Sequence, residues 1–412
     1  MQKNYCEGCT DLVREQAFTN IRDTFKRINT FQYDSNIHSH PKALVLGLTN
    51  RCVHQCTYCF VDQNNLDMNY ETAENAVQWL LNNNEKENDK PEIVFFGGEP
   101  LLKFNDIIKP LVEKYEDQIC FSITTSGSLL NEDIVDFFYK HQIGVLLSFD
   151  GVPEVQNKQR PLGNKNSFNE ILKNIPYLLL RLPHTTMRAT LTKHSIPYLY
   201  ETILMAAELG FESFTFCPNA YEEWTKKEEK LLEEQLMKVG LYIYKKLLQN
   251  EYPIEIQCFS KIYQGIEEEK ADNVKFNNEI LRCGLGTTSC GVAPNGDIVP
   301  CQESTSCSNL HAIGNVNNGG IDYNIHEQFL KNYWEKINNI TCNLGCSDRQ
   351  KKLCLSDLCP SRLEDFNFKI TSPKCITLRM IEKITARLYF LCNHSMNPLI
   401  SKYFKEGEQI ND

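Results

Sequence analysis

Two kinds of segment are missing from this 412-residue sequence. The first residues, MQKNYCEGCTDLVREQ, contain no apolar stretch of the sort that forms the centre of an export signal. No apolar run along the chain approaches the roughly 18 residues that a membrane-spanning helix needs. From these absences we expect a cytoplasmic protein without a membrane partner.

Positive charge is also scarce. The chain has 43 Lys and Arg residues against 53 Asp and Glu residues, which gives a formal net charge of -10. An acidic surface repels the phosphates of nucleic acids, so we expect no nucleic-acid partner. A hydrophobic content of 42% and a charged content of 23% are typical of an ordinary globular protein.

Apolar strands and amphipathic helices alternate from residue 42 onward. Segments with the nearly continuous apolar character of strands covered on both faces are 42–48, 92–98, 120–127, 144–151, 186–191 and 213–219. Segments with helical character are 70–83, 131–142, 167–182, 195–210 and 224–249. The alternation predicts an α/β fold with a parallel sheet, a partial (β/α)6 TIM-like barrel whose functional residues lie at the carboxyl ends of the strands.

The alternation fades after about residue 255, and cysteine, glycine and asparagine become more frequent. A chain of this length favours a large barrel with an appendage. We therefore predict an N-terminal extension (1–41), a barrel (42–255) and a cysteine-rich domain with a C-terminal helix (256–412).

Cysteine is abundant, with 18 residues, although disulfides are rare in the cytoplasm. The cysteines that stand alone in apolar surroundings, and are typical of buried thiols, are Cys120, Cys217, Cys258 and Cys392. The groups at 52–59, 283–307 and 342–375 instead indicate metal binding. Cys6 and Cys9 form a C-x2-C pair with no partner pair nearby, and we interpret them as incidental.

The group in CVHQCTYCF has only three cysteines, Cys52, Cys56 and Cys59, whereas zinc and iron–sulfur sites usually take four protein ligands. The C-x3-C-x2-C spacing follows the first strand, and FFGGEP (95–100) follows the second. Together these motifs resemble the radical S-adenosylmethionine (SAM) superfamily. The resemblance implies a [4Fe–4S] cluster on the three thiolates, with SAM on the open iron as the source of a 5′-deoxyadenosyl radical.

The resemblance also implies which residues contact SAM. They are Tyr58 and Phe60 beside the last cysteine, Gly97, Gly98 and Glu99 of the second strand end, Ser126 of the third, and Ser148 and Arg160 of SFDGVPEVQNKQR. Three other interpretations stay open. The trio could form a zinc site with His54, GGEP could be an ordinary turn, and Ser148 with Asp150 could cap a helix.

The C-terminal cysteines resemble those of the SPASM domain, which in that family holds two auxiliary [4Fe–4S] clusters. The order CGLGTTSCGVAPNGDIVPC, then CNLGCSDRQKKLCLSDLC, carries the resemblance. It implies ligands Cys283, Cys290, Cys301 and Cys359 for the first cluster, and Cys342, Cys346, Cys354 and Cys375 for the second. The spacing 342–359 is longer than the family's usual spacing, Cys307 is a possible substitute ligand, and two zinc sites are the alternative.

Radical enzymes with this domain are mainly sulfatase maturases and maturases of ribosomal peptides. The sulfatase maturases carry an aspartate base after the third auxiliary cysteine, where this chain has Gln302, and Glu303 is the possible catalytic substitute. We therefore favour an oxidoreductase that forms thioether crosslinks in a cysteine-containing precursor peptide, as in sactipeptides or ranthipeptides. An external electron donor such as flavodoxin or ferredoxin is implied. The alternatives are carbon–carbon crosslinking, epimerisation, a sulfatase maturase, or an iron–sulfur electron carrier.

Overall fold

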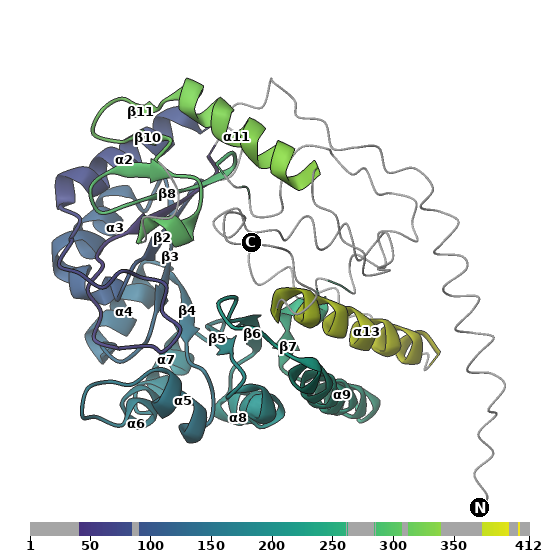
Figure 1. The fold of residues 1–412 in the computed structure, drawn as a ribbon. Helices are drawn as coiled ribbons and strands as arrows, with labels where there is room; N and C mark the ends of the chain where they lie inside the picture. The colour runs from purple at the N-terminus through teal and green to yellow at the C-terminus, as the bar shows by residue number, and fades with distance from the viewer. Residues whose placement is uncertain are drawn as a thin grey trace, which may run out of the picture.

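One curved sheet organises the molecule (Figure 1). The computed structural model describes residues 41–84, 90–260, 262, 284, 286–306, 312–338, 373–394 and 403. The sheet has 11 strands in the order β11-β10-β9-β8-β1-β2-β3-β4-β5-β6-β7. Every neighbouring pair from β8 through β1 to β7 is parallel, whereas β9, β10 and β11 are antiparallel.

The six predicted barrel strands are all present. They are β1 (Ala43–Gly47), β2 (Glu92–Phe96), β3 (Cys120–Thr125), β4 (Gly144–Ser148), β5 (Thr186–Leu191) and β6 (Ser213–Pro218). The strands outside the prediction are β7 (Glu255–Ile256), β8 (Ser289–Val292), β9 (Asp297–Val299), β10 (Gly314–Asn315) and β11 (Gly320–Ile321). These have two to four residues each, too short for a periodicity to be visible in the sequence. The predicted α/β partial barrel is confirmed.

Helices cover the outer side of the sheet, as Figure 1 shows. Those of the barrel are α2 (Tyr70–Asn83), α3 (Lys109–Tyr115), α4 (Glu132–Lys140), α5 (Pro153–Gln159), α6 (Ser167–Leu172), α7 (Ile175–Arg181), α8 (Leu199–Leu209) and α9 (Lys226–Leu248). Shorter turns of other helix types are η1 (Pro100–Lys103), η2 (Phe104–Ile108), η3 (Ile196–Tyr198) and η4 (Gln302–Thr305). Two further helices follow, α11 (Tyr323–Asn338) and α13 (Pro373–His394).

The helix ends follow local chemistry. The side chain of Asn131 accepts the N–H of Ile134, and Thr225 with Glu228 forms a capping box at α9. Gly210 ends α8 with φ of +96°, a left-handed conformation that favours glycine. The predicted helix 167–182 is interrupted, because Pro176 lies at the start of a new helix, α7, and cannot continue the ladder of α6.

Burial alternates along the barrel strands and identifies their two faces. In β4, Val145 and Leu147 are buried, whereas Leu146 and Ser148 are half-buried. In β5, Met187 and Ala189 are almost fully buried, and the residue between them, Arg188, is half-buried. Because successive side chains point to opposite faces of a sheet, the half-buried set faces away from the helices. We call the space on this inner side of the curved sheet the lumen.

The C-terminal part of the chain joins both ends of the barrel. Strand β8 pairs with β1 and extends the parallel sheet, so residues far apart in sequence become neighbours. Helix α13 packs on α9, where Lys383 donates to Glu233 at 2.5 Å. The predicted division of the chain at residues 255 and 256 stays a prediction.

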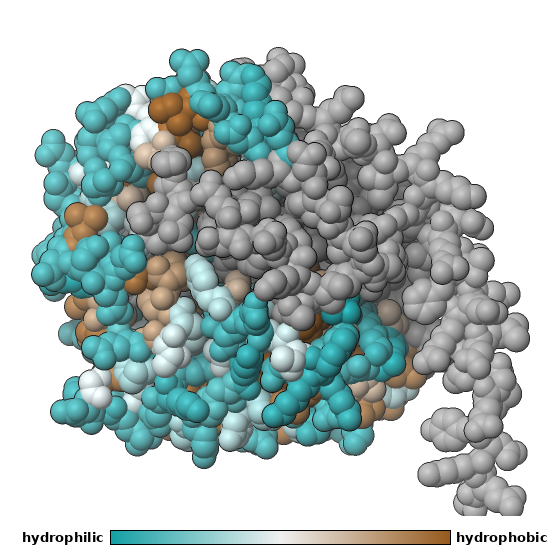
Figure 2. Space-filling view, viewed as in Figure 1, coloured by the Kyte–Doolittle hydropathy of each residue, from teal (hydrophilic) through white to brown (hydrophobic). Residues whose placement is uncertain are grey.

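The surface around α5, α6 and α9 is mainly hydrophilic (Figure 2). This is consistent with a helix layer whose apolar side chains face the sheet, as in α9, where Leu232, Leu236 and Val239 are fully buried. Within the described residues, no helix combines the length and the apolar character needed to cross a membrane.

Candidate functional site

The three clustered cysteines lie in the loop between β1 and α2, which we call the cysteine loop (residues 48–69). Its base is closed by backbone hydrogen bonds from Asn50 to Leu66 and from Met68 to Leu48, both 2.9 Å. Asp67 reinforces this closure, because its carboxylate accepts the hydroxyl of Thr49 at 2.5 Å and pairs with Lys103 at 2.8 Å. The loop therefore starts and ends at the carboxyl end of the first strand.

Two of the three thiols are half-buried, and the third, Cys59, is exposed. Burial, with the nearby charge of Glu99, raises the pKa of Cys52 to about 12. Burial also raises the pKa of Cys56 to about 11, although the Arg160 guanidinium acts in the opposite direction. Both groups are therefore neutral thiols at pH 7 until a cation displaces their protons.

The zinc site with His54 is not formed. His54 is fully buried, with Nδ1 3.1 Å from the carbonyl oxygen of Arg160 and Nε2 3.0 Å from Oγ of Ser128. Both ring nitrogens are thus engaged by groups other than the thiols. Within the described ranges, no group of three or more His, Cys, Asp or Glu side chains is gathered in a way that could hold a single metal ion. A loop with three soft sulfur donors and no fourth fits an iron–sulfur cluster with an open iron better than a closed zinc site.

The GGEP segment packs directly on the cysteine loop. A Cβ on Gly97, which has φ of +133°, would lie 2.5 Å from the carbonyl oxygen of Thr49, and a Cβ on Gly98 would collide with the carbonyl of Arg51. The N–H groups of Gly98 and Glu99 donate to these same two carbonyls at 2.7 and 2.9 Å. GGEP is therefore more than an ordinary turn, because its glycines permit a backbone-to-backbone contact that positions the loop.

The carboxylate of Glu99 is fully buried and turned toward the end of β3. It accepts hydrogen bonds from the Thr125 hydroxyl at 2.7 Å, from the Ser126 amide at 2.9 Å and from the Ser126 hydroxyl at 2.5 Å. Glu99 and Ser126, both predicted SAM contacts, are thus brought together and join the second strand end to the third. Their roles as SAM contacts stay predictions, as do those of Gly97 and Gly98.

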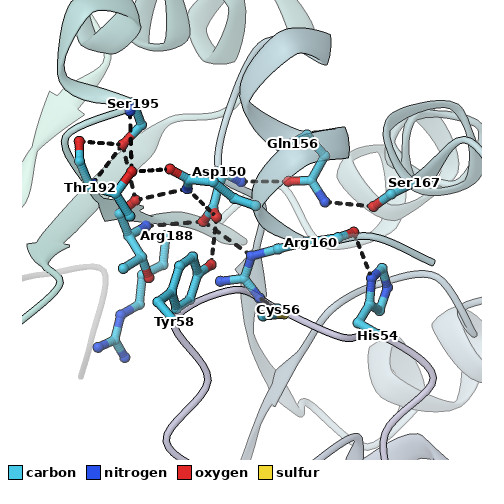
Figure 3. Close-up of polar contacts among 12 residues, drawn as sticks. His54, Cys56, Tyr58, Asp150, Gln156, Arg160, Ser167, Arg188, Thr192 and Ser195 are labelled. Carbon is cyan, nitrogen blue, oxygen red and sulfur yellow. Dashed lines mark hydrogen bonds and ion pairs between the residues drawn. The ribbon is translucent and has the colours of Figure 1, made fainter. Parts of the chain in front are cut away.

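A second buried carboxylate, Asp150, organises the end of β4 (Figure 3). Its oxygens pair with Nε of Arg160 at 3.1 Å and accept the Tyr58 hydroxyl at 2.5 Å. They also accept Nε2 of Gln159 at 2.8 Å and the amide of Thr190 at 3.0 Å. Asp150 thereby connects the cysteine loop, the helix α5 and the strand β5.

Arg160 lies between this carboxylate and a cluster thiol. Its NH1 is 3.9 Å from Sγ of Cys56, and its guanidinium carbon is 5.4 Å from the centre of the Tyr58 ring. Burial disfavours its charge, but the neighbouring charges of Asp150, Tyr58 and Cys56 together outweigh burial and raise the pKa of Arg160 well above its ordinary value. Arg160 is therefore a permanently charged group beside the cysteine loop.

The sequence suggested helix capping as an alternative role for Ser148 and Asp150, and this is wrong. The residue at the start of α5 is Val152, which makes no side-chain capping bond, and Asp150 instead binds Arg160. Two aromatic residues were predicted near SAM. The Tyr58 hydroxyl donates a hydrogen bond to Asp150, and the Phe60 ring stacks on Phe96 of β2 with ring centres 6.3 Å apart. The position of Phe96 at the end of an apolar run was its only sequence signal.

Three of the eight predicted auxiliary ligands lie in the described residues. Cys290 is 1% exposed in β8, opposite Leu44 of β1, and Cys375 is half-buried near the start of α13. Cys301 is half-buried at the start of η4, where its sulfur accepts the amide of Glu303 at 3.4 Å. The predicted ligands that lie outside the described residues are Cys283, Cys342, Cys346, Cys354 and Cys359; the same holds for Cys307, Cys6 and Cys9.

Glu303 lies near the lumen. Its charge is one of those that raise the pKa of Arg188 in β5, after the larger contribution of Cys217 in β6. Arg188 was not among the predicted site residues. Its position as a basic residue inside an apolar strand was the signal that could have identified it.

Comparisons with known proteins agree with this geometry. A family model described as the radical SAM superfamily matches residues 46–206, which contain the cysteine loop and the ends of β1 to β5. An uncharacterised protein of Methanocaldococcus jannaschii is 32% identical over 53% of this chain and 75% of its own length. A cysteine-type anaerobic sulfatase-maturating enzyme of Clostridium perfringens is 23% identical over 79% of this chain and 95% of its own length.

A solved structure, Streptococcus suis SuiB bound to its precursor peptide SuiA, has the same fold. The two share a TM-score of 0.56 with 16% identity, over 90% of this chain and 89% of SuiB. The three thiols in one loop after β1, the glycines that pack on that loop and the match of the family model lead to one conclusion. The chain belongs to the radical SAM superfamily.

Proposed function

We propose that this chain is a radical SAM enzyme that forms thioether crosslinks in a cysteine-containing precursor peptide. The observation that carries the proposal is the cysteine loop, with three thiols, no fourth cysteine ligand within the loop, and the GGEP backbone packed against it. A [4Fe–4S] cluster held by Cys52, Cys56 and Cys59 would cleave bound SAM to methionine and a 5′-deoxyadenosyl radical, which abstracts hydrogen from the peptide.

The residues around the loop have distinct tasks in this proposal. Cys52, Cys56 and Cys59 give up their protons to hold the cluster. Arg160, fixed by Asp150, presents a cation to the SAM carboxylate, together with the hydroxyl of Ser148. The curved sheet surrounds the reacting atoms and excludes water, which protects a reactive carbon radical.

A peptide substrate is supported by the relatives. SuiB binds a precursor peptide, and the sulfatase-maturating enzyme of C. perfringens matches this chain over nearly its whole length. Thioether closure removes two hydrogen atoms from the peptide. One leaves as a hydrogen atom, the thiol loses a proton, and one electron must pass to an acceptor.

Auxiliary iron–sulfur clusters would provide that acceptor. Cys290 lies in β8, which pairs with β1, and Cys301 follows β9, so a cluster that used both residues would lie at the β1 side of the sheet. An external donor such as flavodoxin or ferredoxin would supply the electron that starts each cycle.

A sulfatase maturase is the second candidate, favoured by the length of the C. perfringens match. Gln302 stands after Cys301, where the sulfatase maturases carry their aspartate base, and an amide cannot accept a proton at neutral pH. Glu303 would have to replace it, from the next position of η4.

The test uses the full-length protein, reconstituted with iron and sulfide without oxygen and supplied with dithionite and SAM. 5′-Deoxyadenosine should form. Short cysteine-rich peptides encoded beside the gene should then lose two hydrogen atoms per crosslink together with one free thiol, measured by mass spectrometry. Conversion of a sulfatase peptide cysteine to formylglycine would favour the second candidate, and absence of 5′-deoxyadenosine would reject both.

A further inference from the structure

Arg188 occupies a central place on the inner side of the sheet. It lies in β5, in register with Ser148 of β4 on one side and with Thr215 of β6 on the other. Its strand neighbours Met187 and Ala189 are almost fully buried toward the helices, so the half-buried Arg188 side chain faces the lumen.

Among the described residues, no carboxylate lies at contact distance from the charge of Arg188. Its NH2 donates to Sγ of Cys217 at 3.4 Å, and within the described part of the chain no Asp or Glu oxygen lies within ion-pair distance of its guanidinium. A thiol is a weak acceptor and occupies one of five guanidinium N–H donors. A half-buried cation left in this state is costly unless it binds an oxygen ligand.

The other lumen arginine differs in position and in partner. Arg160 comes within 3.9 Å of the Cys56 sulfur and is paired with Asp150. Arg188 instead extends to β6, which lies five strands along the sheet from β1 and its cysteine loop. In Figure 3 the ring of Tyr58 lies between the two guanidinium groups. The Arg188 pKa is raised mainly by Cys217 and also by Glu303, and Arg160 acts in the opposite direction, so the two arginines share one space.

We infer that Arg188 is a substrate-binding residue whose guanidinium hydrogen-bonds a carboxylate of the peptide, an Asp or Glu side chain close to the carbon that is attacked. Cys217 is its positioning partner, which holds one edge of the guanidinium and leaves the others toward the lumen. The inference rests on the proposed peptide function. It assigns to the enzyme a preference for acidic residues at the crosslinking position, since a guanidinium fork matches a carboxylate better than an amide.

Cys217 offers a direct reporter of this subsite, because a ligand on Arg188 shields the thiol beside it. The reconstituted full-length protein is treated with iodoacetamide, and alkylation of Cys217 is followed by mass spectrometry of the tryptic segment 194–226, in which it is the sole cysteine. The two probes are acetyl-Gly-Asp-Gly-amide and acetyl-Gly-Asn-Gly-amide, which differ only in the carboxylate.

The aspartate peptide should slow alkylation of Cys217 about threefold or more relative to the asparagine peptide. Arg188→Met should abolish this difference. Arg181→Met is the matched control, because Arg181 pairs with Asp136 on the outer surface, and it should keep the difference. Equal protection by the two peptides in the wild-type protein would overturn the inference.

A further arm uses SAM alone. If SAM protects Cys217 and loses this protection in Arg188→Met, Arg188 holds the SAM carboxylate and the inference fails. If SAM protection persists in the variant while aspartate protection is lost, the inference is supported. Formation of 5′-deoxyadenosine by the wild-type protein is measured separately, so a failure of the radical SAM function is distinguished from a failure of the carboxylate subsite.

Discussion

The guanidinium groups of Arg160 and Arg188 both face the lumen, and their charges are balanced in different ways. Arg160 is paired with the buried carboxylate of Asp150, lies against the Tyr58 ring and is fixed beside Cys56. Arg188 contacts the thiol of Cys217 and, among the described residues, has no carboxylate within ion-pair distance.

The difference separates a structural cation from one that is available to a ligand. The Asp150–Arg160 pair has already compensated the cost of removing both charges from water, so it can position the cysteine loop before any ligand binds. A cation without a carboxylate at contact distance stabilises the folded chain little, but it gains a strong partner when a carboxylate enters. The charge of Arg160 is therefore balanced before any ligand binds, whereas the charge of Arg188 is balanced only when the substrate carboxylate binds.

The largest expected effect is a loss of activity on removing a thiol from the cysteine loop, beside the Asp150–Arg160 pair. Cys56→Ala should eliminate the cluster of the cysteine loop, with complete loss of 5′-deoxyadenosine, because the loop then keeps only two of its three thiols. Iron content, EPR of the reduced protein and 5′-deoxyadenosine are the measurements. Cys120→Ala is the matched control and should behave like the wild type, because Cys120 in β3 is exposed and the expectation of a buried thiol there is wrong. Retained SAM cleavage in Cys56→Ala would contradict the assignment.

Removing the carboxylate of the Asp150–Arg160 pair tests most directly whether Arg160 is balanced inside the protein. Asp150→Asn leaves the Arg160 charge buried without its carboxylate and should lower the free energy of unfolding by about 3–5 kcal/mol, measured by urea titration. Asp136→Asn removes a carboxylate from a half-exposed pair with Arg181 and should cost only about 0–1 kcal/mol. Equal decreases in the free energy of unfolding of the two variants would show that the buried Asp150–Arg160 pair stabilises the fold no more than the half-exposed Asp136–Arg181 pair.

Most of the barrel could be predicted from the sequence because its determinants are local. Helix α2 begins and ends at the predicted residues, and the β5 strand has its predicted bounds. Periodicity, caps and the glycine at position 210 act over a few residues, so they are visible in a single sequence. The strands β8 to β11 were missed because they have only two to four residues each, and the pairing of β8 with β1 depends on contacts across more than 200 positions of the chain.

The chemistry of the site was only partly visible for the same reason. The cysteine spacing and GGEP are short motifs, so the thiols and glycines could be named. The link from Tyr58 to Asp150 joins residues 92 positions apart, and the sequence suggested for Asp150 only an alternative role in capping a helix. Arg188 was overlooked because an arginine in a strand has meaning only once the inner face of the sheet is known.

Asp67, at the base of the cysteine loop, should contribute a stabilisation between that of a surface ion pair and that of a buried one. Burial opposes ionisation of Asp67, but hydrogen bonds from Arg51 and Lys103 lower its pKa from 3.8 to about 2. Its side chain is 25% exposed, so Asp67→Asn should cost about 1 kcal/mol, between the surface and buried limits. This stabilisation is fully present above pH 4 or so and is lost as the pH falls toward about 2. The wild-type and variant unfolding free energies should therefore converge on acidification, and a constant difference would contradict the ion-pair explanation.

The smallest expected effect on the free energy of unfolding is that of Arg188→Met, and it contrasts with the effect of Arg160→Met. Arg160→Met leaves the buried Asp150 carboxylate without its cation and should cost about 3–5 kcal/mol of unfolding free energy. Arg188→Met removes a cation with no carboxylate beside it, and its apolar replacement keeps much of the side-chain volume, so the change should stay within about 0.5 kcal/mol of zero or be stabilising. Urea titration of both variants in the absence of peptide measures the contrast. If Arg188→Met lowered the free energy of unfolding as much as Arg160→Met, the Arg188 charge would already be compensated inside the protein. The distinction between a cation balanced by the protein and a cation balanced by substrate would then not hold.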